Sequence, residues 1–314
     1  SNFVRIFNFD KMLSTLLNIA PLFILILIGF VLAKIKLSDA NWTKTLNTYS
    51  LNLGFPCLIF YSLTQSNISI LDYKDIILAN SFFLILCFLI CFGLAIFING
   101  PLKRTLPICL TFSNIAFLGI PILKQIYGES SVAETGIISS CYLFWVFTIG
   151  IGHLEYHKLG TINLKKISIN LLKNPLLISV LLGTIVNLGG WKIPNLLFQP
   201  IDMIAKSVTP LVSISLGTFI YSISFKNEKN SLQIILFSLS SLFVIPCILW
   251  LSMLLMDLDI KTYKITILEA AMPVALTPFA LAEKYNLDQK FIAKIIVVST
   301  ILSIISISFW AITL

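Results

Sequence analysis

Charged residues are scarce in this chain: Asp, Glu, Lys and Arg make up 11% of its 314 residues, against about 25% in soluble globular domains. About 20 apolar residues are enough for a helix to span a bilayer. Nine runs of 18 or more residues contain no Asp, Glu, Lys or Arg: 12–33, 45–71, 76–102, 105–123, 135–154, 174–191, 207–225, 230–256 and 295–314. A tenth run, 265–282, contains only Glu269. We therefore predict an all-α polytopic membrane protein with ten transmembrane helices and no soluble domain.

The basic residues are unevenly distributed, although the net charge of +8 alone would suggest a nucleic-acid partner. By the positive-inside rule, connections rich in Lys and Arg face the cytoplasm. The connections after odd-numbered spans hold 14 of the 22 Lys and Arg residues: Lys34, Lys36, Lys44, Lys103, Arg104, Lys158, Lys165, Lys166, Lys173, Lys226, Lys229, Lys284, Lys290 and Lys294. We therefore expect a multi-pass protein of a bacterial inner membrane with both termini outside, lipid as its surroundings and no nucleic acid as partner.

The chain carries signs of an internal duplication. Three landmarks recur in the same order at an offset of 154 residues: Pro21, Gly29 and Pro56, then Pro175, Gly183 and Pro210. Chance is the alternative, since 12 prolines offer many pairings. A repeat of five spans, 12–157, would enter the membrane inverted relative to its copy, 173–314, because five is odd. Inverted repeats are typical of secondary transporters, which bind substrate near the midplane between the halves.

Two predicted spans contain helix breakers at corresponding places. Span 4 has Gly119 and Pro121, and span 9 has Pro273 and Pro278. Proline removes a helical hydrogen bond and clashes with the preceding turn. A simple kink is the alternative for either span alone, but matched interruptions in two halves point to a transport site. We therefore predict broken crossover helices 4 and 9.

A broken helix exposes backbone N–H groups and a positive dipole end, which suit a carboxylate. Asn114 adds an amide donor and acceptor beside the first break. Span 2 has polar residues of its own, including Asn52, although interhelical hydrogen bonding would also explain them. The predicted substrate-binding set comprises Asn114, Ser113, Gly119, Pro121, Asn52, Pro273, Thr277 and Pro278.

Glu269 is the one acidic residue well inside a predicted span. A charge at the centre of a membrane helix costs at least about 2.5–3.5 kcal/mol, so Glu269 is a candidate site for coupling to H⁺ or Na⁺. The alternative is a position near the outer boundary. Lys124 could attract an anion, although snorkelling to the interface explains it more simply. Asp202 and Lys206, four residues apart, fit a helix-surface ion pair.

His153, Glu155 and His157 form the one metal-like pattern. Histidines four apart on a helix can bind zinc, but no third ligand is evident. We therefore interpret them as interfacial side chains and expect no metal and no cofactor. The sequence also lacks hydrolase and phosphate-loop motifs.

A series of short motifs runs along the whole chain. The motifs are Tyr49-x6-Pro56-Cys-Leu-Ile-Phe60, Asn114-x2-Phe117-Leu-Gly119-Ile-Pro121, Tyr127-Gly128, Lys173-Asn174-Pro175, Gly183, Pro210-Leu211, Leu216-Gly217 and Ala271-Met272-Pro273. Their order and spacing resemble the auxin efflux carrier family, with similarity to bacterial malonate and carboxylate permeases and, distantly, to bile acid:sodium symporters.

The resemblance implies a scaffold domain of helices 1, 2, 6 and 7 and a transport domain of helices 3–5 and 8–10. It also implies an elevator-type motion, an organic anion as substrate with Asn114 in contact with it, and a homodimer through the scaffold. We therefore expect a secondary transporter of a small organic anion, a carboxylate in the first instance, rather than an enzyme. A membrane-embedded ligand sensor and, with less support, an intramembrane enzyme are the alternatives.

Overall fold

The computed structural model describes residues 9–65, 73–98, 100, 102–159, 163–225, 230–259 and 263–314. Lys226 and Lys229 lie outside these ranges, and the side chain of Lys284 is not described. Within them the chain is helical, with a single isolated β-bridge and no strand. The helices are α1 (Phe9–Lys34), α2 (Ala40–Tyr49), η1 (Ser50–Gly54), α3 (Phe55–Gln65), α4 (Lys74–Ala95), α5 (Leu102–Thr111), η3 (Ile115–Gly119), α6 (Ile120–Tyr127), α7 (Ser131–Trp145), η4 (Val146–Gly150), α8 (Ile151–Leu159), α9 (Leu164–Leu172), α10 (Pro175–Leu188), α11 (Asn195–Ser222), α12 (Ser231–Leu239), η5 (Ser240–Val244), α13 (Ile245–Leu255), α14 (Lys264–Ala270), α15 (Thr277–Tyr285) and α16 (Gln289–Thr313).

Six helices of the described chain are long and apolar enough to cross a membrane. A seventh crossing is reached if α9 and α10, bent by 55°, form one broken span. The all-α membrane fold is thus confirmed. The six helices are Leu13–Lys34, Lys74–Ala95, Ser131–Lys158, Asn195–Ser222, Ser231–Leu255 and Gln289–Thr313.

Three predicted spans do not meet this standard. The helix over 40–65 begins with the polar α2, whereas the helices over 105–123 and 265–282 are interrupted. Both interruptions fall where the sequence predicts broken helices. The count of ten spans therefore remains a prediction.

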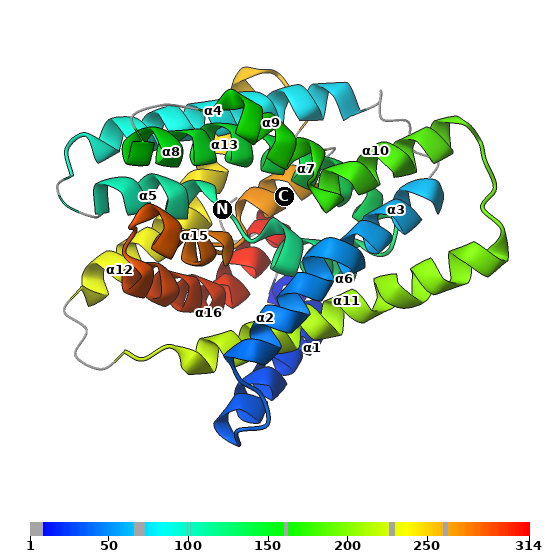
Figure 1. Cartoon of the computed structure of the whole chain (residues 1–314), viewed down its shortest axis with the longest axis horizontal. Coiled ribbons are helices and arrows are strands. Elements are labelled where there is room, and N and C mark those ends of the chain that lie inside the picture. Colours follow the sequence, from blue (N-terminus) through cyan, green and yellow to red (C-terminus); the bar gives the residue numbers. More distant parts are fainter. Residues whose placement is uncertain are drawn as a thin grey trace.

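The helices pack into two groups. One contains α1, α2, α3, α10 and α11: α1 packs on α11, and α3 packs on both α10 and α11. The other contains α4, α5, α7, α12, α13 and α16, with α4 against α7 and α13, and α12 against α16. In Figure 1 the blue α1 and yellow-green α11 cross on one side, while α4, α8 and α13 run along the other. The broken helices pack mainly on the second group, and α6 and η3 also contact α1 and α11 of the first.

Two glycines allow α1 and α11 to cross with their backbones in contact. A Cβ added at Gly29 would overlap the carbonyl oxygen of Ile214, and one added at Gly217 would overlap the carbonyl oxygen of Ile26. Small residues permit this close approach between membrane helices, where dispersion replaces the hydrophobic effect as the main driving force. Thr218 donates a hydrogen bond of 3.3 Å to the Gly29 carbonyl at the same crossing.

We expect Gly217→Ala to lower the thermal stability of the purified protein. The added methyl meets backbone, which cannot rotate away, and overpacking of this kind costs about 1–3 kcal/mol. Gly93→Ala is the matched control, because nothing lies within 4 Å of a Cβ at Gly93 in α4. Equal melting temperatures for the two variants would contradict this account of the crossing.

Candidate functional site

The first broken helix unwinds for three residues. The helix α5 ends at Thr111, and the π-helical turn η3 begins only at Ile115. Asn114 lies between them with φ −80° and ψ 56°, and its carbonyl accepts bonds from the N–H groups of Leu118 and Gly119. Pro121 lies in the first turn of α6, where a missing N–H is tolerated.

The second broken helix unwinds for longer and pairs with the first. The helix α14 ends at Ala270 and α15 begins at Thr277. The N–H of Asn114 donates to the carbonyl of Pro273 (2.7 Å), and the N–H of Ala275 donates to the carbonyl of Phe112 (2.8 Å). These bonds form an antiparallel bridge between Ser113 and Val274. Two irregular segments from opposite halves of the chain thus satisfy each other's backbone groups within the bundle, as buried backbone requires.

Hydroxyl groups from neighbouring helices accept hydrogen bonds from the backbone N–H groups of Ser113 and Val274, the two residues at the centre of the bridge. The N–H of Ser113 donates to the Tyr142 hydroxyl (2.6 Å), which in turn donates to the Thr111 carbonyl. The N–H of Val274 donates to the Ser299 hydroxyl (3.2 Å). Tyr142 and Ser299 are 157 positions apart, the same offset as Pro121 and Pro278. The two halves therefore support their breaks in the same way.

A cavity of about 270 Å³ lies against this crossing. Asn114, on its wall, is 1% exposed, and neither atom of its carboxamide group has a hydrogen-bond partner among the described residues. Burying an amide without hydrogen-bond partners costs about 1–3 kcal/mol of folding free energy. The carboxamide of Asn114 is therefore available to form hydrogen bonds with a bound ligand. The lining residues are Leu51, Asn52, Ser113, Asn114, Ile115, Ala116, Phe117, Ser139, Tyr142, Leu143, Phe147, Asn174, Pro175, Leu176, Ala275 and Thr277.

Glu269 lies one side chain behind this cavity. It is 1% exposed, its Oε1 accepts a hydrogen bond of 3.0 Å from the hydroxyl of Ser139, and its Oε2 has no partner among the described residues. Ser139 itself lines the cavity. Glu269 is therefore buried inside the bundle and linked to the cavity wall by a single hydroxyl.

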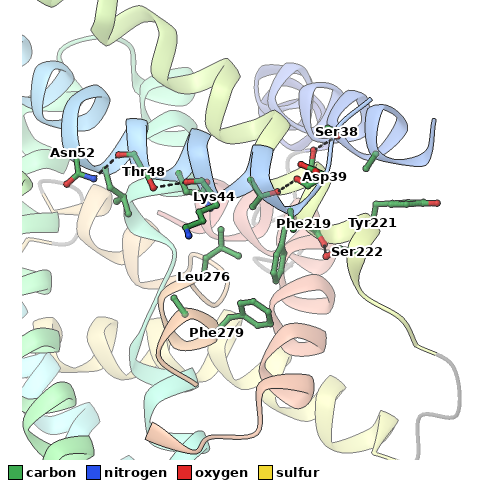
Figure 2. Close-up of a pocket in the computed structure, with 17 residues that line it drawn as sticks. Ser38, Asp39, Lys44, Thr48, Asn52, Phe219, Tyr221, Ser222, Leu276 and Phe279 are labelled. Atoms are coloured by element: carbon green, nitrogen blue, oxygen red, sulfur yellow. Dashed lines mark hydrogen bonds between the residues drawn. The ribbon is translucent and has the colours of Figure 1, made fainter. Parts of the chain in front are cut away.

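A larger cavity of about 690 Å³ leads from the surface toward the crossing. Figure 2 shows its two walls: Lys44 and Thr48 on α2 and Asn52 on η1 lie on one side, and Leu276 and Phe279, from the segment around α15, lie on the other. Leu51 and Asn52 line both cavities. The two cavities therefore adjoin at Leu51 and Asn52, between the groups of helices.

The predicted substrate-binding residues fall into two sets. Four line the small cavity: Asn114, Ser113, Asn52 and Thr277. The other four, Gly119, Pro121, Pro273 and Pro278, do not line it but lie at the breaks and their flanking turns. Sequence reasoning missed Ser139 and Tyr142 as site residues. Their hydroxyls in an otherwise apolar span were the available signal, but hydroxyls are common in packed membrane helices.

The other charged candidates have local partners. Lys124 forms an ion pair of 2.8 Å with Glu129, and Lys206 forms one of 2.5 Å with Asp202, as the sequence predicted for the latter pair. His153 stacks on Phe92 with ring centroids 4.0 Å apart. Glu155 binds Lys166 (2.6 Å), and no cluster of three or more metal-ligand side chains occurs in the described part of the chain.

A bundle of apolar helices in which two broken segments meet beside a cavity with amide and hydroxyl groups in its wall is typical of membrane transporters. The chain belongs to the auxin efflux carrier family: the family model described as membrane transport protein matches residues 14–311. It is 27% identical over 317 residues to an uncharacterized transporter of Methanothermobacter thermautotrophicus, covering 95% of this chain and 97% of the relative.

Two further relatives carry more specific names. The chain is 21% identical to auxin efflux carrier component 8 of Arabidopsis thaliana, covering 87% of this chain and 90% of the relative. It is 20% identical to a putative malonate transporter of Rhizobium meliloti, covering 92% of each. The protein is therefore a multi-pass membrane transporter.

Proposed function

We propose that the protein is a secondary active transporter of a small organic anion, a carboxylate, and that the cavity at the helix crossing binds it. One observation carries the proposal. The carboxamide of Asn114 is buried, without partners, on the wall of a cavity between two broken helices. Its Nδ2 can donate to a carboxylate oxygen without bringing a permanent charge into the membrane. The putative malonate transporter among the relatives is named for a carboxylate.

The chemistry of the cavity wall supports an anion of low charge. None of the described lining residues is Lys, Arg, His, Asp or Glu. The polar groups are amides and hydroxyls, among them Asn52, Asn174 and Thr277. Thr277 opens α15, so the positive end of that helix adjoins the cavity. Amides, hydroxyls and a helix dipole stabilise a carboxylate but leave it free to dissociate, as transport requires.

We propose an elevator-type mechanism on ten spans arranged as two inverted repeats. Helices 1, 2, 6 and 7 correspond to α1, α2–α3, α10 and α11, which pack on one another. Helices 3–5 and 8–10 would form the moving domain around the paired breaks. Both cavities lie between the two groups, where a sliding domain would carry its substrate past a fixed scaffold. The matching roles of Tyr142 and Ser299 support the inverted duplication.

The larger cavity supports an orientation for the described state. It is lined by residues after span 1 and at the end of span 7, Ser38 and Ser222 among them. These connections are predicted to be cytoplasmic, so we propose a cytoplasm-facing state in a bacterial inner membrane with both termini outside. A homodimer through the scaffold remains part of the proposal.

Counterflow of labelled substrate tests the function. A thermal-shift screen of dicarboxylates, monocarboxylates, amino acids and bile-acid-like anions would first identify a stabilising ligand. Proteoliposomes preloaded with that ligand should then take up the labelled form transiently against its gradient, because a transporter exchanges solute across the membrane. A ligand that stabilises the protein without counterflow would favour a membrane sensor, and conversion of the ligand would favour an enzyme.

A further inference from the structure

The small cavity at the helix crossing is lined by a second amide whose donor is not used in folding. Three asparagines line this cavity: Asn52, Asn114 and Asn174. The Nδ2 of Asn52 donates to the Thr48 carbonyl (2.9 Å), so this donor is occupied. The Nδ2 atoms of Asn114 and Asn174 have no acceptor among the described residues. Two amide donors in the cavity wall are therefore available to a ligand.

Asn174 is held in position by the helix that it caps. It lies at the 55° bend between α9 and α10, and its Oδ1 accepts from the N–H groups of Leu176 (2.9 Å) and Leu177 (3.4 Å). Pro175 has no N–H, and the N–H of Ile178 donates to the Asn174 carbonyl (3.0 Å). The first turn of α10 therefore has no backbone N–H left for a ligand. The donor at this positive helix end is the Nδ2 of Asn174, whose orientation is set by the bonds to Oδ1.

Capping alone does not require an asparagine at the start of α10. Aspartate and serine cap helices about as well as asparagine does. Asp39 and Asp288 cap α2 and α16 in this chain through their carboxylates. Asparagine is the one of these three residue types that places an amide donor beside the cavity, and it does so without the negative charge that would repel an anion. The amide of Asn174 therefore contributes to the cavity something that the fold of α10 does not need.

Asn114 and Asn174 reach the cavity from different groups of helices. Asn114 follows α5, in the group that contains α4 and α7, whereas Asn174 begins α10, in the group that contains α1 and α11. The cavity, at about 270 Å³, is slightly smaller than the range of about 300–1,000 Å³ that is usual for ligand pockets. It therefore suits a small anion, and an anion that accepts from both amides bridges the two groups of helices.

We propose that Asn174 determines substrate specificity, because its Nδ2 donates to a second oxygen of the anion whose carboxylate is bound by Asn114. The substrate class is then a small carboxylate with a second oxygen acceptor, as in a dicarboxylate or its half-ester. The inference rests on the proposed function for the carboxylate at Asn114. The contact with Asn174 should lower the Kd about three- to tenfold for an uncharged second acceptor, and about ten- to a hundredfold for a second carboxylate.

Binding of two matched anions to the purified protein tests this inference without requiring transport. Monomethyl malonate and pentanoate are monoanions of similar length, but only monomethyl malonate carries a second carbonyl oxygen. Isothermal titration calorimetry measures their Kd in the parent and in Asn174→Ser. We expect the substitution to raise the Kd for monomethyl malonate about three- to tenfold and to leave that for pentanoate within about twofold. Equal changes for the two anions, or no change for either, would overturn the role of Asn174. Binding of neither anion to the parent would refute the proposed function as well.

Asn163→Ser is the matched control for the loss of a helix cap. Asn163 caps α9 in the same way, with its Oδ1 accepting from the Lys166 N–H (2.9 Å), and it lines neither cavity at the crossing. This variant should leave both Kd values unchanged. A rise for monomethyl malonate equal to that in Asn174→Ser would show that altered capping, rather than a lost contact, causes the effect, and would contradict the inference.

Two further variants separate the contact of Asn174 from that of Asn114. Asn114→Ala should weaken both anions alike, because it removes the contact to the carboxylate that they share. Asn174→Asp keeps the size of the side chain and its capping oxygen, so it tests the donor even if serine destabilises the protein. Its added charge acts on both anions, and the lost donor acts on monomethyl malonate alone. The ratio of the two Kd values should therefore still shift against monomethyl malonate, and an unchanged ratio would overturn the inference.

Discussion

The variant Asn114→Ala is expected to take up carboxylate about ten- to a hundredfold more slowly than the parent while remaining folded. A hydrogen bond to a charged group contributes about 1.5–3 kcal/mol, which corresponds to that range. The loss should appear in binding as well as in transport, since the amide is proposed to contact the bound anion directly. Uptake into proteoliposomes at matched protein density measures it.

The stability of the same variant provides an independent test. Both side-chain atoms of Asn114 are buried without partners among the described residues, so alanine removes two unsatisfied groups. The melting temperature of the ligand-free protein should therefore be unchanged or higher, which is the pattern of a residue retained for function at the expense of stability. Asn170→Ala, at an exposed position on α9, is the matched control and should change neither property. Unchanged uptake by Asn114→Ala would refute its role.

The second large effect is expected for Glu269→Gln, which should abolish concentrative uptake but not exchange. Glutamine keeps the shape of the side chain and the acceptor for the Ser139 hydroxyl, but it cannot bind a proton or neutralise a cation. If Glu269 is the coupling site, accumulation driven by a pH or Na⁺ gradient disappears, while counterflow of preloaded substrate persists. Initial rates with and without each gradient measure this difference.

Glu129→Gln is the matched control for Glu269→Gln. Its side chain is 68% exposed and pairs with Lys124 at the surface, so the substitution removes the same charge without touching the bundle interior. Gradient dependence in the Glu269→Gln variant equal to that of the parent would exclude this residue as the coupling site. Loss of both exchange and accumulation, with a lowered melting temperature, would instead indicate a structural role.

The sequence predicted the breaks because proline and glycine act locally. Pro121 and Pro273 predict an interrupted helix whatever side chains pack around them. It could not predict that Ser113 pairs with Val274 or that Tyr142 and Ser299 hold that bridge. Those contacts depend on the relative position of four helices, and a hydroxyl in an apolar span looks the same whether it packs or supports a site.

The burial of Glu269 was likewise beyond the sequence. Its neighbours along the chain do not show what packs on α14, and the contacts of α14 with α7, α13 and α16 bury the side chain. In the count of ten spans, hydropathy instead predicted more continuous helices than the structure has. Hydropathy finds uncharged runs, yet 105–123 and 265–282 consist of half-helices, each too short to cross a bilayer alone. Their membrane role depends on the pairing of the two breaks.

The most direct test of the central claim is an experimental structure of the protein with its carboxylate substrate bound. The account predicts density for the anion in the cavity at the helix crossing, with a carboxylate oxygen about 3 Å from Nδ2 of Asn114. Substrate density confined to the membrane-facing surface, or a central cavity that stays empty at saturating ligand, would contradict it.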